Sequence, residues 1–374
     1  MSESVYRKLA ERIDMNVTGA PKKGDDYSPA FLKYLEMQFT PEEAEIASFL
    51  SVNPNWLTAQ VVADKSGHPV EEIEQTLGQL AERGVIIGFD GSFVLPPPQL
   101  VFNAPEIREN LKGIRREAAG LYREFFIEDG YYSFYQSSAK GTPRRRTVPV
   151  NQSIGSGQQV LSYEQIESFI DRANMGALAL TPCPCRSRTE MLGERECKDR
   201  HPVAYCLMLG LHAILVSTRG EGKQVTREEA MEYVEKTREY GMVVLTDNSI
   251  EMDDGIVCFC CGCCCSVTRG LSRWDNPRAF ARSNFVARVS EDCSACKTCV
   301  DRCFFHAISL PDYAQSAKID EDRCMGCGVC TVTCPTEALH LERLEREPIF
   351  DTSAEMSARV AAENEAAGQK RPLE

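Results

Sequence analysis

The spacing of apolar residues near the N-terminus predicts three helices followed by a pair of strands. Over 70–83 the apolar residues recur every three or four positions, which places them on one helical face. These residues are Val70, Ile73, Leu77 and Leu80. Two earlier helices are expected over 41–50 and 57–66, and strands over 85–89 and 92–95 flank the turn Asp90-Gly91. Three helices followed by a hairpin is the order of a winged helix, which we expect within residues 1–100.

The pattern further along predicts a second region that mixes helices and strands. Residues 101–157 are expected to form a helical connector, with a helix over 104–126. Residues 158–283 are interpreted as a central α/β domain. Its expected helices span 162–173, 203–217 and 226–240, and its expected strands span 176–180, 242–246 and 255–258. Residues 346–374, rich in Glu and Ala, are expected to be a flexible tail or a single exposed helix. The chain as a whole is predicted to be a multidomain α+β protein.

Composition narrows the class of protein. The chain has 374 residues, 43% of them hydrophobic and 26% charged, as expected for a globular protein of two or three domains. No apolar stretch approaches a bilayer span, and residues 1–13 contain no apolar signal-peptide core, so we expect a cytoplasmic protein. In that reducing compartment, 18 cysteines are better interpreted as metal ligands than as disulfides. The net charge of −13 argues against a nucleic-acid partner.

One cysteine pattern occurs twice. The pattern C-x-x-C-x-x-C-x-x-x-C begins at Cys293 and again at Cys324, and every cysteine of the first set maps onto the second by the same offset. The first set is Cys293, Cys296, Cys299 and Cys303, and the second is Cys324, Cys327, Cys330 and Cys334. Zinc also binds paired C-x-x-C elements, but it gives no reason for a third and a fourth cysteine at these steps in both halves.

From about Phe285 to Leu341 the chain resembles a bacterial-type dicluster ferredoxin, assigned here to residues 284–345. The resemblance implies two 4Fe-4S clusters with crossed ligands. It implies cluster 1 on Cys293, Cys296, Cys299 and Cys334, and cluster 2 on Cys324, Cys327, Cys330 and Cys303. In one position the chain departs from the family pattern: Pro335 follows Cys334 as expected, whereas Phe304 stands where a proline would follow Cys303.

The other ten cysteines all lie in the central region, and they indicate further metal binding. Crowded thiols need a cation that holds them as thiolates. They are Cys183, Cys185, Cys197, Cys206, Cys258, Cys260, Cys261, Cys263, Cys264 and Cys265. We favour one or two additional iron–sulfur clusters, with structural zinc and redox-active thiols as alternatives. The first four of these cysteines can bind one metal centre, and the six cysteines within 258–265 can bind a second. Alternatively, the six later cysteines supply the remaining ligands of the first centre. The spacing does not fix the pairing.

Two residues beside these cysteines are further candidates. Arg186 follows Cys185 and is interpreted either as a donor to cluster sulfur or as a surface charge. His201 is interpreted as a ligand or, more simply, as a capping or surface residue.

The predicted recognition helix of the N-terminal module carries Glu71, Glu72 and Glu74, which argues against docking in a DNA groove. This module is therefore expected to dock a protein.

These observations favour an iron–sulfur electron-transfer protein or a subunit of a cytosolic oxidoreductase, with a larger oxidoreductase as its redox partner. The order of modules resembles 4Fe-4S proteins of anaerobic bacteria. Two alternatives stay open: a redox-sensing winged-helix regulator, and an enzyme whose central cluster keeps an open iron site. No P-loop and no H-E-x-x-H motif is present in the sequence.

Overall fold

The computed structural model describes residues 2–96, 115–201, 205–346 and 349–368. The chain divides into two compact units, each described here by itself. The first unit comprises residues 1–135, 187–194 and 360–374. The second comprises residues 136–186 and 195–359, and it contains all 18 cysteines. The predicted central domain and the predicted ferredoxin domain therefore belong to the same unit.

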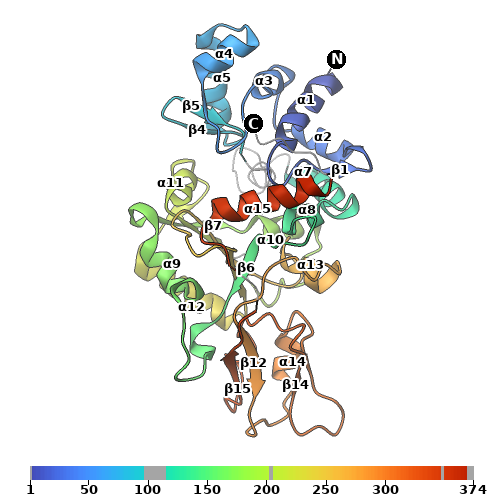
Figure 1. Cartoon of the computed structure of the whole chain (residues 1–374), viewed down its shortest axis with the longest axis vertical. Coiled ribbons are helices and arrows are strands. Elements are labelled where there is room, and N and C mark those ends of the chain that lie inside the picture. The colour runs from blue at the N-terminus through green and yellow to red at the C-terminus, as the bar shows by residue number, and fades with distance from the viewer. Residues whose placement is uncertain (1, 97–114, 202–204, 347–348, 369–374) are drawn as a thin grey trace. The chain divides into compact units, whose positions relative to one another are not determined.

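The first unit is mostly helical (Figure 1). Its helices include α1 (Ser2–Asp14), α2 (Pro29–Glu36), α3 (Pro41–Ala47), α4 (Ala59–Ser66), α5 (Val70–Glu82) and α7 (Arg115–Arg123). Its strands are β1 (Lys22–Lys23), β2 (Asp26–Tyr27), β3 (Leu57–Thr58), β4 (Ile87–Phe89) and β5 (Ser92–Val94). Strands β3, β5 and β4 form one antiparallel sheet in that order.

The local signals in this unit have clear physical causes. Thr40 caps α3 and forms a reciprocal capping box with Glu43, and Gly67 ends α4 in the left-handed conformation. The prediction of a helix over 57–66 is wrong at its start, because Leu57 and Thr58 pair with β5 before the helix begins. Of the connector helix predicted over 104–126, residues 104–114 lie outside the described residues. The described part continues from α7 into a π-helix at Glu124–Glu128.

The second unit is built on a six-stranded sheet in the order β6-β10-β11-β8-β7-β9. The strands are β6 (Arg145–Val148), β7 (Leu178–Pro182), β8 (Tyr205–Leu209), β9 (Lys223–Gln224), β10 (Val243–Asp247) and β11 (Gly255–Cys260). Every pair of neighbouring strands is antiparallel. The prediction of an α/β domain is therefore corrected to an α+β domain, because an α/β domain is built on a mainly parallel sheet.

One predicted helix of this region is wrong in its first half. The helix expected over 203–217 is replaced over its described part by β8 and by α11 (Leu211–Thr218); residues 203 and 204 lie outside the described residues. Strand β8 pairs with β7 on one side and with β11 on the other. A central strand that is apolar on both faces has no alternating pattern, so periodicity alone cannot distinguish it from a buried helix.

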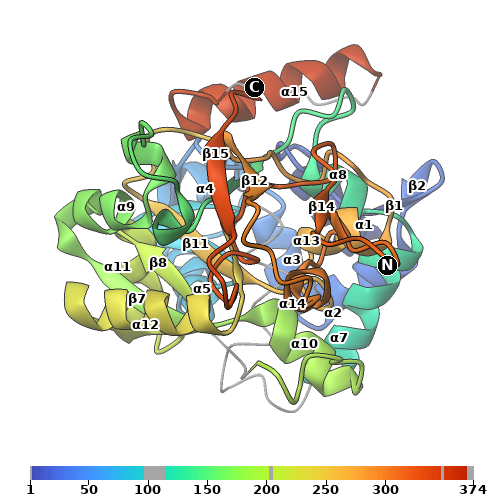
Figure 2. The same cartoon turned by 90° about the horizontal axis from the view of Figure 1, so that it is seen from below.

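The two faces of this sheet bury different residues. Leu178 and Leu207 belong to a large buried cluster that includes residues of α9 (Ile166–Arg172) and α12 (Arg227–Glu239). Ala179 and Met208, their neighbours along the strands, belong instead to a smaller cluster with α11. Successive residues of a strand point to opposite faces, so helices cover both faces of the sheet. Figure 2 shows α9, α11 and α12 around these strands.

The ferredoxin segment of the second unit starts and ends with paired strands. Strands β12 (Phe285–Val289) and β15 (Leu339–Arg343) pair antiparallel over their whole length and lie side by side in Figures 1 and 2. Between them lie α14 (Thr298–Arg302) and the short pair β13 (Ile308–Ser309) and β14 (Lys318–Ile319). The closing pair thus brings the two cysteine loops together.

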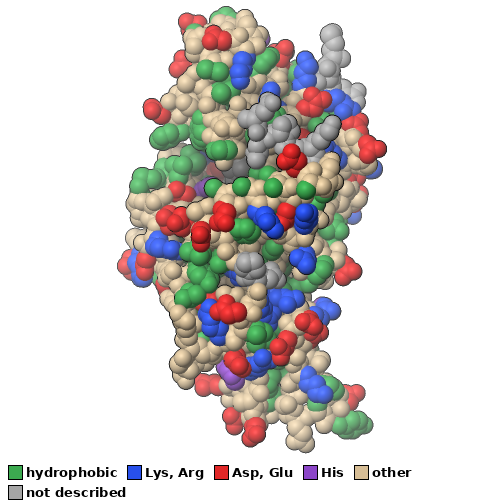
Figure 3. Space-filling model, viewed as in Figure 1, with side chains coloured by type: hydrophobic (Ala, Val, Ile, Leu, Met, Phe, Trp, Pro, Cys, Tyr) green, Lys and Arg blue, Asp and Glu red, His purple; other side chains and the backbone are tan. Residues whose placement is uncertain are grey.

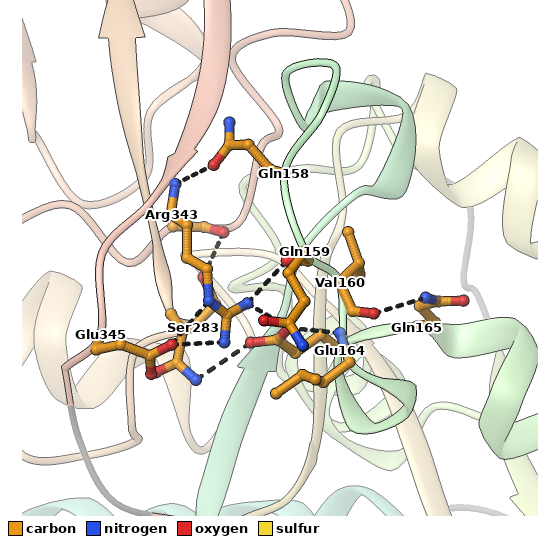
Figure 4. Close-up of polar contacts among 11 residues, drawn as sticks. Gln158, Gln159, Val160, Glu164, Gln165, Ser283, Arg343 and Glu345 are labelled. Carbon is orange, nitrogen blue, oxygen red and sulfur yellow. Dashed lines mark hydrogen bonds and ion pairs between the residues drawn. The ribbon is translucent and has the colours of Figure 1, made fainter.

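Polar contacts hold this ferredoxin segment against the segment before α9 (Figure 4). The Arg343 guanidinium forms an ion pair of 2.8 Å with Glu164, whose side chain is 3% exposed. Arg343 also donates to the Gln159 carbonyl at 3.0 Å, and the Gln158 amide donates to the Leu341 carbonyl at 2.8 Å. The ferredoxin segment is therefore integrated into the second unit by buried charges.

The C-terminal segment forms the single helix that the sequence allowed as an alternative to a flexible tail, but this helix is not fully exposed. Residues Ser353–Ala366 form helix α15, in which Met356, Val360 and Ala361 are buried. These residues recur at helical spacing, which gives an Ala- and Glu-rich segment one apolar face. Residues 369–374 lie outside the described residues.

Candidate metal centres

The duplicated cysteine motif forms two cavities, each lined by four thiols. One cavity is lined by Cys293, Cys296, Cys299 and Cys334. The other is lined by Cys303, Cys324, Cys327 and Cys330. In each cavity the fourth cysteine comes from the opposite repeat, so the structure brings together the sets that the ferredoxin resemblance implies. Two groups of four thiolate donors, one group in each cavity, fit two iron–sulfur clusters.

The backbone repeats together with the cysteines. Ala295 and Lys297 have φ of +54° and +67°, and Gly326 and Gly328, at the same positions of the second repeat, have +67° and +75°. These left-handed residues let each loop fold back around its cavity. A Cβ atom at Gly326 would lie 2.2 Å from the Phe285 carbonyl oxygen, so only glycine fits there.

The two cavities differ in their exposure. Cys296 is exposed in the first cavity, whereas Cys324 and Cys330 in the second are each 8% exposed. Burial raises the pKa of Cys327 to about 12, whereas hydrogen bonding from Thr298 lowers the pKa of Cys296. The first cavity is thus partly open to solvent, and the second faces the interior of the unit.

The ten central cysteines separate into two sets, and all of them are free thiols. In the first set, each thiol contacts the other three. Its members are Cys197, Cys261, Cys263 and Cys264, and their sulfur atoms all lie within 4.8 Å of one another. Four of the six sulfur–sulfur distances run from 3.5 Å, between Cys263 and Cys264, to 3.9 Å, between Cys197 and Cys261. We call this group the four-thiol set.

The remaining six thiols form a closed ring in which each thiol contacts two others. In order around the ring they are Cys183, Cys185, Cys265, Cys260, Cys258 and Cys206. The sulfur atoms of Cys260 and Cys265 are 3.2 Å apart. Among the described residues, no three thiols of this ring converge within 4.8 Å of one another as the four-thiol set does. We call this group the six-thiol ring.

Strand geometry explains the division. Cys258 and Cys260 lie two residues apart in β11, so both point to the same face of the sheet. That face also carries Met208, the partner of Ile256. Cys261, one residue later, belongs with Phe259 to the large cluster on the opposite face. The grouping of Cys197 with the earlier cysteines, one of the pairings left open by the sequence, is not found.

A buried arginine lies between the two groups. Arg186 is 1% exposed, so its interpretation as a surface charge is wrong. Its guanidinium donates to the Phe259 carbonyl at 2.6 Å. Burial acts to lower the pKa of Arg186, but negative charge on nearby thiols, first Cys183 and then Cys261, outweighs burial and raises it. The structure thus places one permanent positive charge beside both thiol groups.

The second ferredoxin cavity adjoins the four-thiol set. Phe304, which follows Cys303, packs onto Gly262, where a Cβ atom would lie 2.7 Å from the Phe304 Cβ. The His201 ring lies edge-on to Phe304 at 6.5 Å. His201 is buried, not a surface residue, and burial lowers its pKa to about 4, so its imidazole is neutral at pH 7. It is not part of the group of ligand atoms that converge in the four-thiol set.

Comparison with known proteins identifies part of this architecture. Residues 317–340 match the family described as a 4Fe-4S binding domain. A stretch of 63 residues is 32% identical to the archaeal-type glutamate synthase [NADPH] of Dehalococcoides mccartyi (strain ATCC BAA-2266 / KCTC 15142 / 195). It covers 17% of this chain and 13% of that protein. No solved structure shows a significant match.

These comparisons support iron–sulfur electron transfer in general. The 4Fe-4S binding domain holds at least one 4Fe-4S cluster, and the matched segment contains the second cysteine repeat. Within the described residues, no helix combines the length and apolar character that a bilayer crossing requires.

Proposed function

We propose that this protein is an electron-transfer protein, or a subunit of an oxidoreductase, that holds two 4Fe-4S clusters in its ferredoxin segment. Cluster 1 would be held by Cys293, Cys296, Cys299 and Cys334, and cluster 2 by Cys303, Cys324, Cys327 and Cys330. The observation that carries this proposal is the pair of four-thiol cavities with crossed ligands. A bound cluster of this kind accepts and releases one electron.

The side chains around the two cavities differ: those of the second cavity exclude water, whereas the first cavity is exposed. Around the second cavity, Phe304, Phe305 and Ile308 exclude water from the thiols. The exposed Cys296 marks the first cavity as the place where a redox partner approaches. Lys297, Glu291 and Asp292 surround it with exposed charges of both signs. We infer that the partner is a protein that docks on this end of the ferredoxin segment.

We further propose that the six-thiol ring holds one additional iron–sulfur cluster. In the part of the chain that the structure describes, no three thiols of the ring converge within 4.8 Å of one another, so the ring suits a cluster of several irons better than one ion. Strand β8 contributes Cys206 and strand β11 contributes Cys258 and Cys260, while Cys183 directly follows β7. Arg186 offsets part of the negative charge of the thiolates. The sheet therefore holds half of the ring thiols on one face.

The N-terminal module is proposed to be a winged-helix-like docking module and not a DNA-binding one. Glu71, Glu72 and Glu74 are exposed on α5, where phosphates would repel them. On the face drawn in Figure 3, acidic and basic side chains are interspersed. This distribution favours a protein partner over the regulator alternative.

The crossed ligand sets can be tested in the full-length chain purified without oxygen. Chemical analysis of this chain should find at least about eight irons and eight inorganic sulfides, as two 4Fe-4S clusters require. Cys334→Ser should alter the same electron paramagnetic resonance (EPR) signal as Cys296→Ser, and Cys303→Ser the same signal as Cys327→Ser. If Cys334→Ser matched Cys327→Ser, the assignment of ligands would be wrong. If these eight cysteines bound zinc and the protein contained no sulfide, the proposed electron-transfer function would be wrong.

A further inference from the structure

The four-thiol set has the dimensions of a site for one ion. A metal bound to four thiolates at about 2.3 Å places neighbouring sulfur atoms about 3.8 Å apart, the edge of a regular tetrahedron. Four of the six sulfur–sulfur distances of the set are 3.5, 3.7, 3.7 and 3.9 Å, and the other two are no longer than 4.8 Å. The thiols of the set therefore lie close enough together to surround one ion as such a tetrahedron.

The ferredoxin cavities provide an internal comparison. Each holds four cysteines, yet among the described residues no three of those thiols lie within 4.8 Å of one another. A cube of iron and sulfide lies between its ligands and keeps them apart. The four-thiol set leaves no such space, because each of its thiols contacts the other three.

Rigid neighbours hold this tetrahedron in place. Cys197, Cys261 and Cys264 are each at most 2% exposed and belong to the large core cluster. Glu196 forms an ion pair with Arg273 at 2.6 Å, which ties the Cys197 segment to α13 (Thr268–Arg273) just after the cysteine run. Expansion of the set to enclose a cluster would have to displace this packing.

We propose that Cys197, Cys261, Cys263 and Cys264 bind one tetrahedral metal ion, Zn²⁺ or Fe²⁺, and no iron–sulfur cluster. Four thiolates in a tetrahedron suit either ion. The ion ties Cys197, which precedes β8, to the loop after β11, and so connects segments far apart in the chain. This proposal is independent of the electron-transfer function, because it concerns cysteines outside the ferredoxin segment.

The neighbouring residues Cys264 and Cys265 supply a matched pair of variants, since they belong to different groups. Metal and sulfide per chain are measured on the full-length protein purified without oxygen. Cys264→Ser should lose one metal ion and no sulfide, whereas Cys265→Ser should keep that ion and lose iron together with sulfide. Loss of several irons with sulfide from Cys264→Ser would overturn the proposal.

A measurement on the unaltered chain covers the case in which Cys264→Ser does not fold. X-ray absorption at the zinc edge should show four sulfur neighbours at about 2.3 Å and no iron neighbour. If the ion is iron, zinc is absent and the wild type contains one iron in excess of its sulfide. Metal equal to sulfide with no zinc, or a disulfide between Cys263 and Cys264 without metal, would overturn the proposal.

Discussion

Phe304 packs directly onto Gly262, so the ferredoxin segment contacts the cysteine run of the central sheet through one aromatic ring and one glycine. A Cβ atom at Gly262 would lie 2.7 Å from the Phe304 Cβ and 3.0 Å from its Cγ. Cys303 precedes the ring, and Cys261 and Cys263 flank the glycine. The phenylalanine that replaces the expected proline thus joins the second cavity to the four-thiol set.

Gly262→Ala should destabilise the second unit by about 1–3 kcal/mol, because the added methyl group overpacks this contact. Denaturant unfolding of the metal-loaded chain measures the change. Phe304→Gly removes the clashing Cβ and the ring, so the double variant should be less destabilised than the two single changes added together. Gly78→Ala in α5 is a matched control with open space around it, and it should stabilise by about 0.5–1 kcal/mol. Additive effects at Gly262 and Phe304 would contradict the contact.

Arg186→Met should weaken metal retention by the central thiols while it preserves much of the side-chain volume. The change removes a buried positive charge and the hydrogen bond to the Phe259 carbonyl, which is worth about 1.5–3 kcal/mol. Arg186→Lys keeps the charge and should retain more metal. Metal per chain after dialysis against a chelator measures the effect. Equal retention by wild type and Arg186→Met would show that the arginine has only a packing role.

Glu164→Gln should destabilise the second unit by about 1–3 kcal/mol, because it removes a buried charged acceptor of the Arg343 guanidinium, which keeps its ion pair with Glu345. Glu342, on the same strand as Arg343, pairs with Arg288 at the surface. Glu342→Gln is therefore the matched control and should cost less than about 1 kcal/mol. Chemical unfolding followed by circular dichroism compares the two variants. If both variants lost a similar amount of unfolding free energy, burial of the Arg343–Glu164 ion pair would not contribute to stability.

The N-terminal module should not bind DNA with useful affinity. Three exposed glutamates on α5 repel phosphates, and binding by counterion release requires basic side chains on that helix. A gel-shift assay at low salt with mixed duplex DNA measures this. Sequence-dependent binding below micromolar concentration would favour the regulator alternative.

The ferredoxin segment could be predicted in detail because its information is local. The cysteine spacing repeats, and the left-handed positions at Gly326 and Gly328 recur in the first repeat. The crossing of Cys303 and Cys334 between cavities came from the family resemblance and not from spacing alone. The N-terminal helices were also accessible, because caps such as Thr40 mark where they begin.

The central region could be predicted only in part, because its organisation is not local. Strand β8 is buried on both sides, which removes the periodic signal that would have identified it. The division of the ten thiols depends on which face of the sheet each one occupies. The alternation of Cys258, Phe259 and Cys260 in β11, continued by Cys261 directly after it, contained a signal for this division. The place of Cys197 in the four-thiol set depends on tertiary packing, which the sequence pattern does not reveal.

The most direct test of the electron-transfer account is a reductive titration of the full-length chain under anaerobic conditions, followed by EPR. The account predicts reversible uptake of at least two electrons per chain, one for each ferredoxin cavity, with signals broadened by interaction between the two sites. Variants Cys296→Ser and Cys327→Ser should each alter one of the two components. A chain that takes up no electrons reversibly, or whose uptake is unchanged in both variants, would contradict the account.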